Sequence, residues 1–188
     1  KQDAKVQQTL DELDAGLRES IGDVRELLVH FRTRTNTEDI EHALQETLQK
    51  FQHQTGLAAH LQIHGEGLPL PPDIQVQVLH VIQEALSNVR KHAMASEVTL
   101  EVTKGASWHF TVRDNGHGID AEARKHLFEP FFTTKPGEHG LGLGLTLSAS
   151  LAAAAKGSLN VEHPVTGGTA FVLALPLVSP PSESAEHP

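Results

Sequence analysis

Apolar residues recur every three or four positions over the first 34 residues, which predicts one long amphipathic helix with a heptad-type seam. Charged residues flank this seam, whose members are Val6, Leu10, Leu13, Leu17, Ile21, Val24, Leu28 and Phe31. A lone amphipathic helix cannot bury its own apolar stripe. We therefore expect residues 1–34 either to pack onto the rest of the chain or to join a helical bundle shared between two subunits.

Helical and strand periodicities alternate from residue 36 to residue 177. Thr35 and Glu38 fit a capping box for a helix that ends near Phe51. Asp73 fits the cap of a long helix that ends near Met94. We expect strands at 57–64, 97–103, 108–113, 158–162 and 169–175, and shorter helices at 121–127 and 146–155. This order predicts an α/β (α+β) two-layer sandwich, with the helices on one face of the sheet.

Composition narrows the classes of function. The chain has 188 residues, 38% of them hydrophobic, which is enough for a core in one or two domains. Its net charge of −9 argues against a nucleic-acid partner, which would need a basic surface. Without cysteine there is no disulfide framework and no thiolate chemistry. A tail at 178–188, rich in Pro, Ser and Glu, is expected to be disordered.

No apolar run approaches the roughly 18 residues of a membrane span, and no signal peptide is visible. We therefore expect a cytoplasmic fragment without direct membrane contact. The chain starts with Lys, and we interpret it as a piece of a longer protein.

The long helix predicted after Asp73 carries a polar stripe. Glu84, Asn88 and either Lys91 or His92 are spaced by three or four residues, which places them on one helical face. An ordinary solvated face is the alternative interpretation. The functional one is a magnesium-phosphate site, because magnesium prefers oxygen ligands and Asn88 offers an amide oxygen. Lys91 would meet phosphate as a cation.

Two glycine motifs follow predicted strands. Asp114-Asn-Gly116-His-Gly118 is either an ordinary turn or a site at which Asp114 accepts a hydrogen bond from an exocyclic amine. In the second interpretation Gly116 and Gly118 let the backbone approach a flat base, and His117 is exposed to solvent. Gly167-Gly168-Thr169 fits a hairpin turn by itself.

A third glycine motif alternates with leucines, in the order Gly140, Leu141, Gly142, Leu143 and Gly144, just before a predicted helix. Glycines at a helix N-terminus suit phosphate binding, although the motif matches neither the P-loop nor the Rossmann fingerprint. The segment before it contains three phenylalanines and three candidate phosphate contacts, namely Phe128, Phe131, Phe132, Thr133, Thr134 and Lys135. It is either a loop pinned to the core by phenylalanines or a lid over a ligand. The thirteen histidines form no zinc-type cluster.

Together these motifs resemble the catalytic ATP-binding domain of two-component sensor histidine kinases, within the Bergerat-fold (GHKL) ATPases. The resemblance covers residues 36–177 and implies ATP and Mg²⁺ as ligands. It implies that Asn88 binds magnesium and that Asp114 binds adenine. It implies that Glu84 and Lys91 are catalytic, with Glu84 as the candidate for polarising the acceptor imidazole. The implied nucleotide-binding set is Asn88, His92, Asp114, Gly116, Gly118, Thr133, Thr134, Lys135, Gly140, Leu141, Gly142, Leu143, Gly144 and Thr169.

Residues 83–93 and 25–32 also resemble the nitrate/nitrite-sensor-like subgroup. That subgroup typically has a short lid without a phenylalanine box, and this chain departs from it by carrying the box. A second departure is that no His-Asp or His-Glu pair, the family's phosphoacceptor motif, occurs in the chain. His30 and His42 are interpreted as surface residues. Residues 1–34 resemble the second helix of the dimerisation hairpin, so we expect the first helix and the acceptor histidine upstream.

The resemblance implies three partners or settings: a homodimer through residues 1–34, the receiver domain of a response regulator, and a full-length parent in the inner membrane. Two alternatives remain open. One is an anti-sigma-type serine kinase or plain ATPase on the same fold. The other is a nucleotide-binding or dimerisation module without catalysis.

Overall fold

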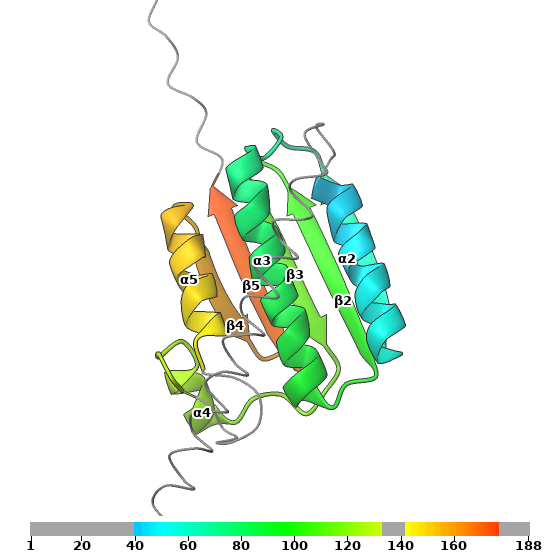
Figure 1. Cartoon of the computed structure of the whole chain (residues 1–188), viewed down its shortest axis with the longest axis vertical. Coiled ribbons are helices and arrows are strands. Elements are labelled where there is room, and N and C mark those ends of the chain that lie inside the picture. The colour runs from blue at the N-terminus through cyan, green and yellow to red at the C-terminus, as the bar shows by residue number, and fades with distance from the viewer. Residues whose placement is uncertain (1–39, 133–141, 177–188) are drawn as a thin grey trace, which may run out of the picture.

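The computed structural model describes residues 40–132 and 142–176 (Figure 1). The helices are α2 (Ile40–Thr55), α3 (Pro72–Asn88), α4 (Ala121–His126) and α5 (Gly144–Ala154), and a π-helical turn, η1 (Val89–Ala93), continues α3. The strands are β1 (Ala58–Gly65), β2 (Glu97–Lys104), β3 (Ser107–Asp114), β4 (Ser158–Glu162) and β5 (Ala170–Pro176). Every helix and strand expected between residues 40 and 132 or between 142 and 176 is present.

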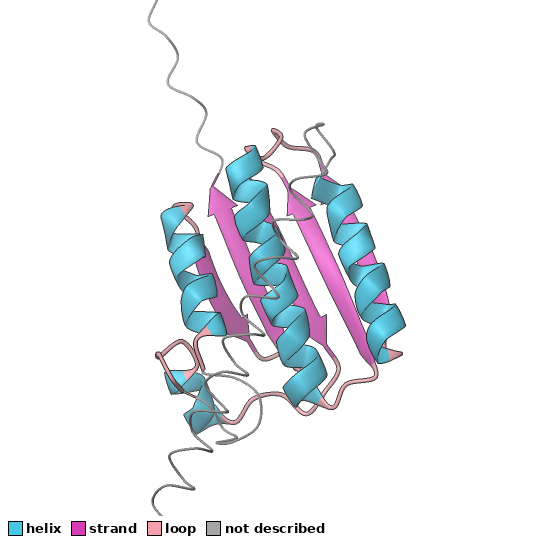
Figure 2. Ribbon diagram, in the orientation of Figure 1, coloured by secondary structure: helices cyan, strands magenta, loops and turns pink. Residues whose placement is uncertain are grey.

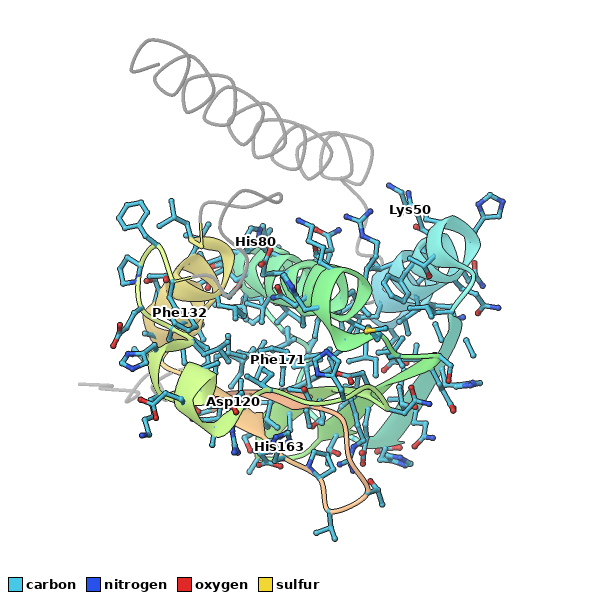
Figure 3. The ribbon with its side chains drawn as sticks, turned by 90° about the horizontal axis from the view of Figure 1, so that it is seen from below. Lys50, His80, Asp120, Phe132, His163 and Phe171 are labelled. Atoms are coloured by element: carbon cyan, nitrogen blue, oxygen red, sulfur yellow. The ribbon has the colours of Figure 1, made fainter. Side chains whose placement is uncertain are left out.

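The described strands form one sheet in the order β1-β2-β3-β5-β4. β1 pairs with β2 in parallel, and the other neighbours are antiparallel. Helices α2, α3 and α5 lie side by side over one face of this sheet (Figures 1 and 2). Figure 3, turned by 90°, shows the helical layer above and the sheet below, with side chains filling the space between them. The predicted two-layer sandwich is confirmed.

Alternate residues of the central strands face the helices. In β3 the buried positions are Trp108, Phe110 and Val112, which pack in the same core as Leu44 of α2. Side chains of a strand point alternately to its two faces. The next residue in the same phase, Asp114, is buried as well. The strand therefore ends with a carboxylate on the helical side of the sheet.

The start of α3 differs from the expectation. Pro71 is the N-cap residue, Pro72 is the first helical residue, and no side chain caps the helix. The prediction that Asp73 is the cap is wrong, because Asp73 lies inside the first turn. Proline suits this first position, since its missing N–H would have no partner within the helix. The helical segment ends where expected, at Met94, which adopts a left-handed conformation with φ of 50°.

The helix after the third glycine motif begins at Gly144 rather than at Thr146. The expected helix at 1–34, the capping box at Thr35 and the tail at 178–188 lie outside the described residues. In the part of the chain that the structure describes, no helix combines the length and the apolar character needed to cross a membrane.

Candidate functional site

Asp114 ends β3 with only 4% of its surface exposed. Its Oδ1 accepts a hydrogen bond from the backbone N–H of Gly116 at 2.8 Å. Its own backbone N–H donates to the carbonyl of Thr169 at 2.9 Å, and Thr169 is also buried. A buried carboxylate needs hydrogen-bond donors to offset the loss of water. An ionised carboxylate has more acceptor positions than Gly116 fills, so it is suited to accept a further bond from a ligand amine.

Two glycine turns close on either side of Asp114. Gly168 has a φ of +80°, and a Cβ atom there would lie 1.9 Å from the carbonyl oxygen of Asp114. A Cβ atom on Gly116 would lie 2.1 Å from the carbonyl oxygen of Ala93. Neither position leaves room for a side chain. The fold thus brings together three segments that are far apart in sequence: the end of α3 with η1, the turn after β3, and the turn between β4 and β5.

Glu84 and Asn88 lie one turn apart on α3, both half-buried. The Nδ2 of Asn88 donates to Oε1 of Glu84 at 3.3 Å. The carboxylate of Glu84 lies against the start of α5, where a Cβ atom on Gly144 would be 2.1 Å from Oε1. A helix N-terminus carries partial positive charge, which favours a carboxylate in this place. Glycine at position 144 therefore makes room for Glu84, and Glu84 orients the amide of Asn88.

The orientation of Asn88 bears on magnesium. Because Nδ2 donates to Glu84, Oδ1 is the amide atom that can face a cation. Magnesium is usually held by one or two protein oxygens together with phosphate oxygens and water. Within residues 40–132 and 142–176, no group of three or more His, Cys, Asp or Glu side chains is arranged to hold a metal ion. The residues therefore fit magnesium brought by a nucleotide and do not fit a metal centre made of protein ligands alone.

The π turn changes the predicted polar face beyond Asn88. A π turn holds more residues than an α turn, so the α-helical spacing of three and four residues does not carry over unchanged from Asn88 to Lys91 and His92. Lys91 is half-buried and His92 is exposed. The loop between β3 and α4, residues 114–120, is called the glycine loop here. The π turn presents the carbonyl of Ala93 to this loop, where it accepts a hydrogen bond from the backbone N–H of His117 at 3.1 Å. This turn therefore links the helix of Asn88 to the loop of Asp114.

The expected lid is described only at its two borders. The backbone N–H of Phe131 donates to the carbonyl of Gly142 at 3.0 Å, which joins these borders. Gly142 has a φ of +66°, and Leu143 lies between it and the first residue of α5, Gly144. Phe131 is 70% exposed, so the interpretation that phenylalanines pin this segment to the core does not hold for it. The candidate residues outside the described ranges are Thr133, Thr134, Lys135, Gly140 and Leu141.

Charged side chains stabilise α4, which lies between the glycine loop and the lid. Asp120 caps it by accepting a hydrogen bond from the N–H of Glu122 at 2.8 Å, and this bond is the main reason that the pKa of Asp120 is lowered. At the other end, Glu129 accepts from Nδ1 of His126 at 3.0 Å. This hydrogen bond raises the pKa of His126.

One residue of the site carried no signal in the sequence. His163 follows β4, and its ring nitrogens lie 2.8 Å from the carbonyl oxygen of Gly168 and 3.0 Å from that of Ile119. It therefore lies between the β4–β5 turn and the loop that leads to Asp120 (Figure 3). His117, in contrast, is exposed as predicted. A lone histidine before a proline has no periodicity or motif that could predict this contact.

Comparison with known families and proteins agrees with this geometry. Residues 73–179 match the family described as histidine kinase-, DNA gyrase B-, and HSP90-like ATPase. The chain is 32% identical over 168 residues to the nitrate/nitrite sensor protein NarQ of Escherichia coli (strain K12). It is 29% identical over 168 residues to the sensor protein TdiS of Thauera aromatica. These alignments cover 88% and 82% of this chain but only 27% and 30% of the two sensors.

Solved structures share the fold. Full-length ShkA in complex with AMPPNP has a TM-score of 0.65 at 24% identity, over 76% of this chain and 31% of that one. The mycobacterial sensor histidine kinase MprB has a TM-score of 0.59 at 20% identity, over 74% of this chain and 95% of that one. At such identities the likeness is one of fold.

Proposed function

We propose a function from the premise that this chain belongs to the family of histidine kinase-, DNA gyrase B- and HSP90-like ATPases. In our proposal it is the ATP-binding catalytic part of a sensor histidine kinase. Residues 36–177 are the catalytic domain, and residues 1–34 are part of a dimerisation bundle. The whole protein would transfer the γ-phosphoryl group of ATP to a histidine outside this chain, for relay to a response regulator.

The buried carboxylate of Asp114 between two glycine turns is the observation that carries this proposal. Asp114 accepts a hydrogen bond from the exocyclic amine of adenine, while Gly116 and Gly118 let the backbone lie against the base. The N–H of Gly116 already holds the carboxylate in place, so the entropy cost of ordering this side chain on nucleotide binding is small. The site should therefore bind a base without that amine more weakly, because the buried carboxylate of Asp114 would then lack a hydrogen-bond donor.

Phosphate is bound at the other end of the site. Asn88 holds magnesium through Oδ1, and Glu84 keeps the amide in that orientation. When bound, magnesium neutralises charge on the triphosphate, which is the main requirement of phosphoryl transfer. Lys91 and the N-terminus of α5 supply further positive charge, and His92 is a further candidate contact to the nucleotide. The lid, with its candidate contacts Thr133, Thr134, Lys135, Gly140, Leu141, Gly142, Leu143 and Gly144, closes over the phosphates.

Glu84 also remains our candidate for polarising the acceptor imidazole. Its place against the start of α5 suits a residue that both orients Asn88 and borders the phosphates. The partners in this proposal are a second copy through residues 1–34 and the receiver domain of a response regulator. The similarity to two sensor proteins supports such a signalling role. The identity to NarQ supports the nitrate/nitrite-sensor-like resemblance for the catalytic part. An inner-membrane location for the whole protein is part of the same proposal.

The chemistry of the phosphorylated product tests this function. The whole protein is incubated with magnesium and ATP labelled in the γ-phosphoryl group. Phosphohistidine, which is labile in acid and stable in base, is expected, and an Asn88→Ala variant should form none. Acid-stable phosphoserine would instead favour the anti-sigma-type serine kinase. Release of free phosphate alone would favour a plain ATPase, and the absence of any turnover would favour a module without catalysis.

A further inference from the structure

The ring of His163 bridges two loops that border Asp114. One nitrogen lies 2.8 Å from the carbonyl oxygen of Gly168, and the other lies 3.0 Å from the carbonyl oxygen of Ile119. Gly168 packs directly on the backbone of Asp114, where even a Cβ atom would be too close. Ile119 follows Gly118 in the glycine loop. His163 therefore joins the segments on the two sides of the carboxylate.

Both partners of the ring are carbonyl oxygens, which only accept hydrogen bonds. Each ring nitrogen must therefore carry a hydrogen for both bonds to form. A neutral imidazole has one N–H group, and an imidazolium has two. A neutral ring donates one of these two hydrogen bonds, and the carbonyl oxygen that receives it depends on the tautomer.

We propose that His163 is a positioning residue of the nucleotide site. Its ring holds the Gly168 turn and the end of the glycine loop in the arrangement that binds the adenine end of a nucleotide, and so it sets the affinity. The inference that the ligand is a nucleotide rests on the proposed function. The bridge made by His163 is observed independently of that function.

The rest of the glycine loop shows why this bridge matters. The start of the loop is held by the hydrogen bonds from Gly116 to Asp114 and from His117 to Ala93. His163 holds the end of the loop. The ring also lies directly over Gly118, where a Cβ atom would be 2.3 Å from Cε1. Loss of the bridge frees the part of the loop that must lie against the base.

Substitution of His163 isolates the contribution of its ring to the bridge. Other ionisable groups lie on the same segments, namely Asp114, His117 and Asp120 around the loop and Glu162 on β4. They are unchanged in a variant at position 163, so the difference between variant and wild type isolates the ring.

A His163→Phe variant tests the proposal, because phenylalanine keeps a flat ring over Gly118 and has no N–H. Calorimetry with AMPPNP and magnesium measures the affinity of the variant and of wild type. The variant should bind about fivefold more weakly, the loss expected for one ordinary hydrogen bond. His109→Phe, on an exposed position of β3, should match wild type.

Hydrogen exchange in the nucleotide-free protein supplies a second readout. The amides of residues 118–120 should exchange several-fold faster in His163→Phe than in wild type. Equal exchange or equal affinity in the two proteins would overturn the proposal. If wild type binds no nucleotide, the proposed function fails. The difference in hydrogen exchange then tests separately whether His163 holds the two loops together.

Discussion

Replacement of Gly144 by alanine should weaken nucleotide binding without unfolding the chain. The new Cβ atom would lie 2.1 Å from Oε1 and 2.3 Å from Cδ of Glu84. These atoms are the far end of a flexible side chain, so Glu84 turns away instead of the helices moving apart. The hydrogen bond from Asn88 is then lost. The Gly144→Ala change therefore acts on the orientation of Asn88 through Glu84.

The expected magnitudes follow from two opposing effects. Alanine in place of glycine gains up to about 1 kcal/mol of helix stability, and less at the first residue. Loss of one hydrogen bond costs about 1 kcal/mol. The free energy of unfolding should therefore change by less than about 1 kcal/mol. The affinity for a magnesium-nucleotide should fall about fivefold, because Asn88 is no longer held in its orientation.

A double-mutant cycle with Glu84→Ala separates this mechanism from others. Calorimetry with AMPPNP and magnesium measures the affinity of both single variants and the double variant, and denaturant unfolding measures their stability. If Gly144→Ala acts by displacing Glu84, it should have no further effect once Glu84 is absent, giving a coupling energy near 1 kcal/mol. Additive effects, or a Gly144→Ala variant that binds like wild type, would refute the reasoning.

Two further predictions concern stability and pH. Gly168→Ala should cost at least about 2 kcal/mol more than Gly167→Ala in denaturant unfolding, because both positions have positive φ but only Gly168 meets a backbone carbonyl; equal costs would contradict this contact. The pKa of His126 should lie above its ordinary value of about 6.5 in an NMR titration and fall back in Glu129→Gln, because the carboxylate favours the charged ring. Its contribution to stability is therefore present below about pH 6.5 and is lost as the pH rises through the raised pKa; identical titrations in the two proteins would contradict the assignment.

Much of the fold could be predicted from periodicity alone. The alternation that buries Trp108, Phe110 and Val112 also sets the phase of Asp114, so its place on the helical side follows from the pattern. The spacing of Glu84 and Asn88 on a helix likewise predicts that their side chains meet. Local rules suffice here because each contact is made within one element.

Contacts between distant segments could not be predicted in this way. The close approach of Gly144 to Glu84 depends on how α5 packs on α3, and the bridge from His163 to Ile119 depends on the sheet order. The π turn after Asn88 departs from α-helical geometry, and no pattern of residues in the sequence predicted it. Asp73 was misplaced because Pro71 and Pro72 set the start of the helix.

The central claim is that Asp114 binds the adenine of a magnesium-nucleotide, and calorimetry with AMPPNP tests it most directly. Asp114→Asn is nearly isosteric and keeps an oxygen for the N–H of Gly116, but it places an amide where the base needs an acceptor. Asp73→Asn, on the exposed first turn of α3, is the matched control. Magnesium-dependent binding by wild type and by the control, with affinity about 10- to 100-fold lower in Asp114→Asn, is the predicted result. Wild-type protein that binds no nucleotide, or an Asp114→Asn variant that binds as tightly as wild type, would contradict the account.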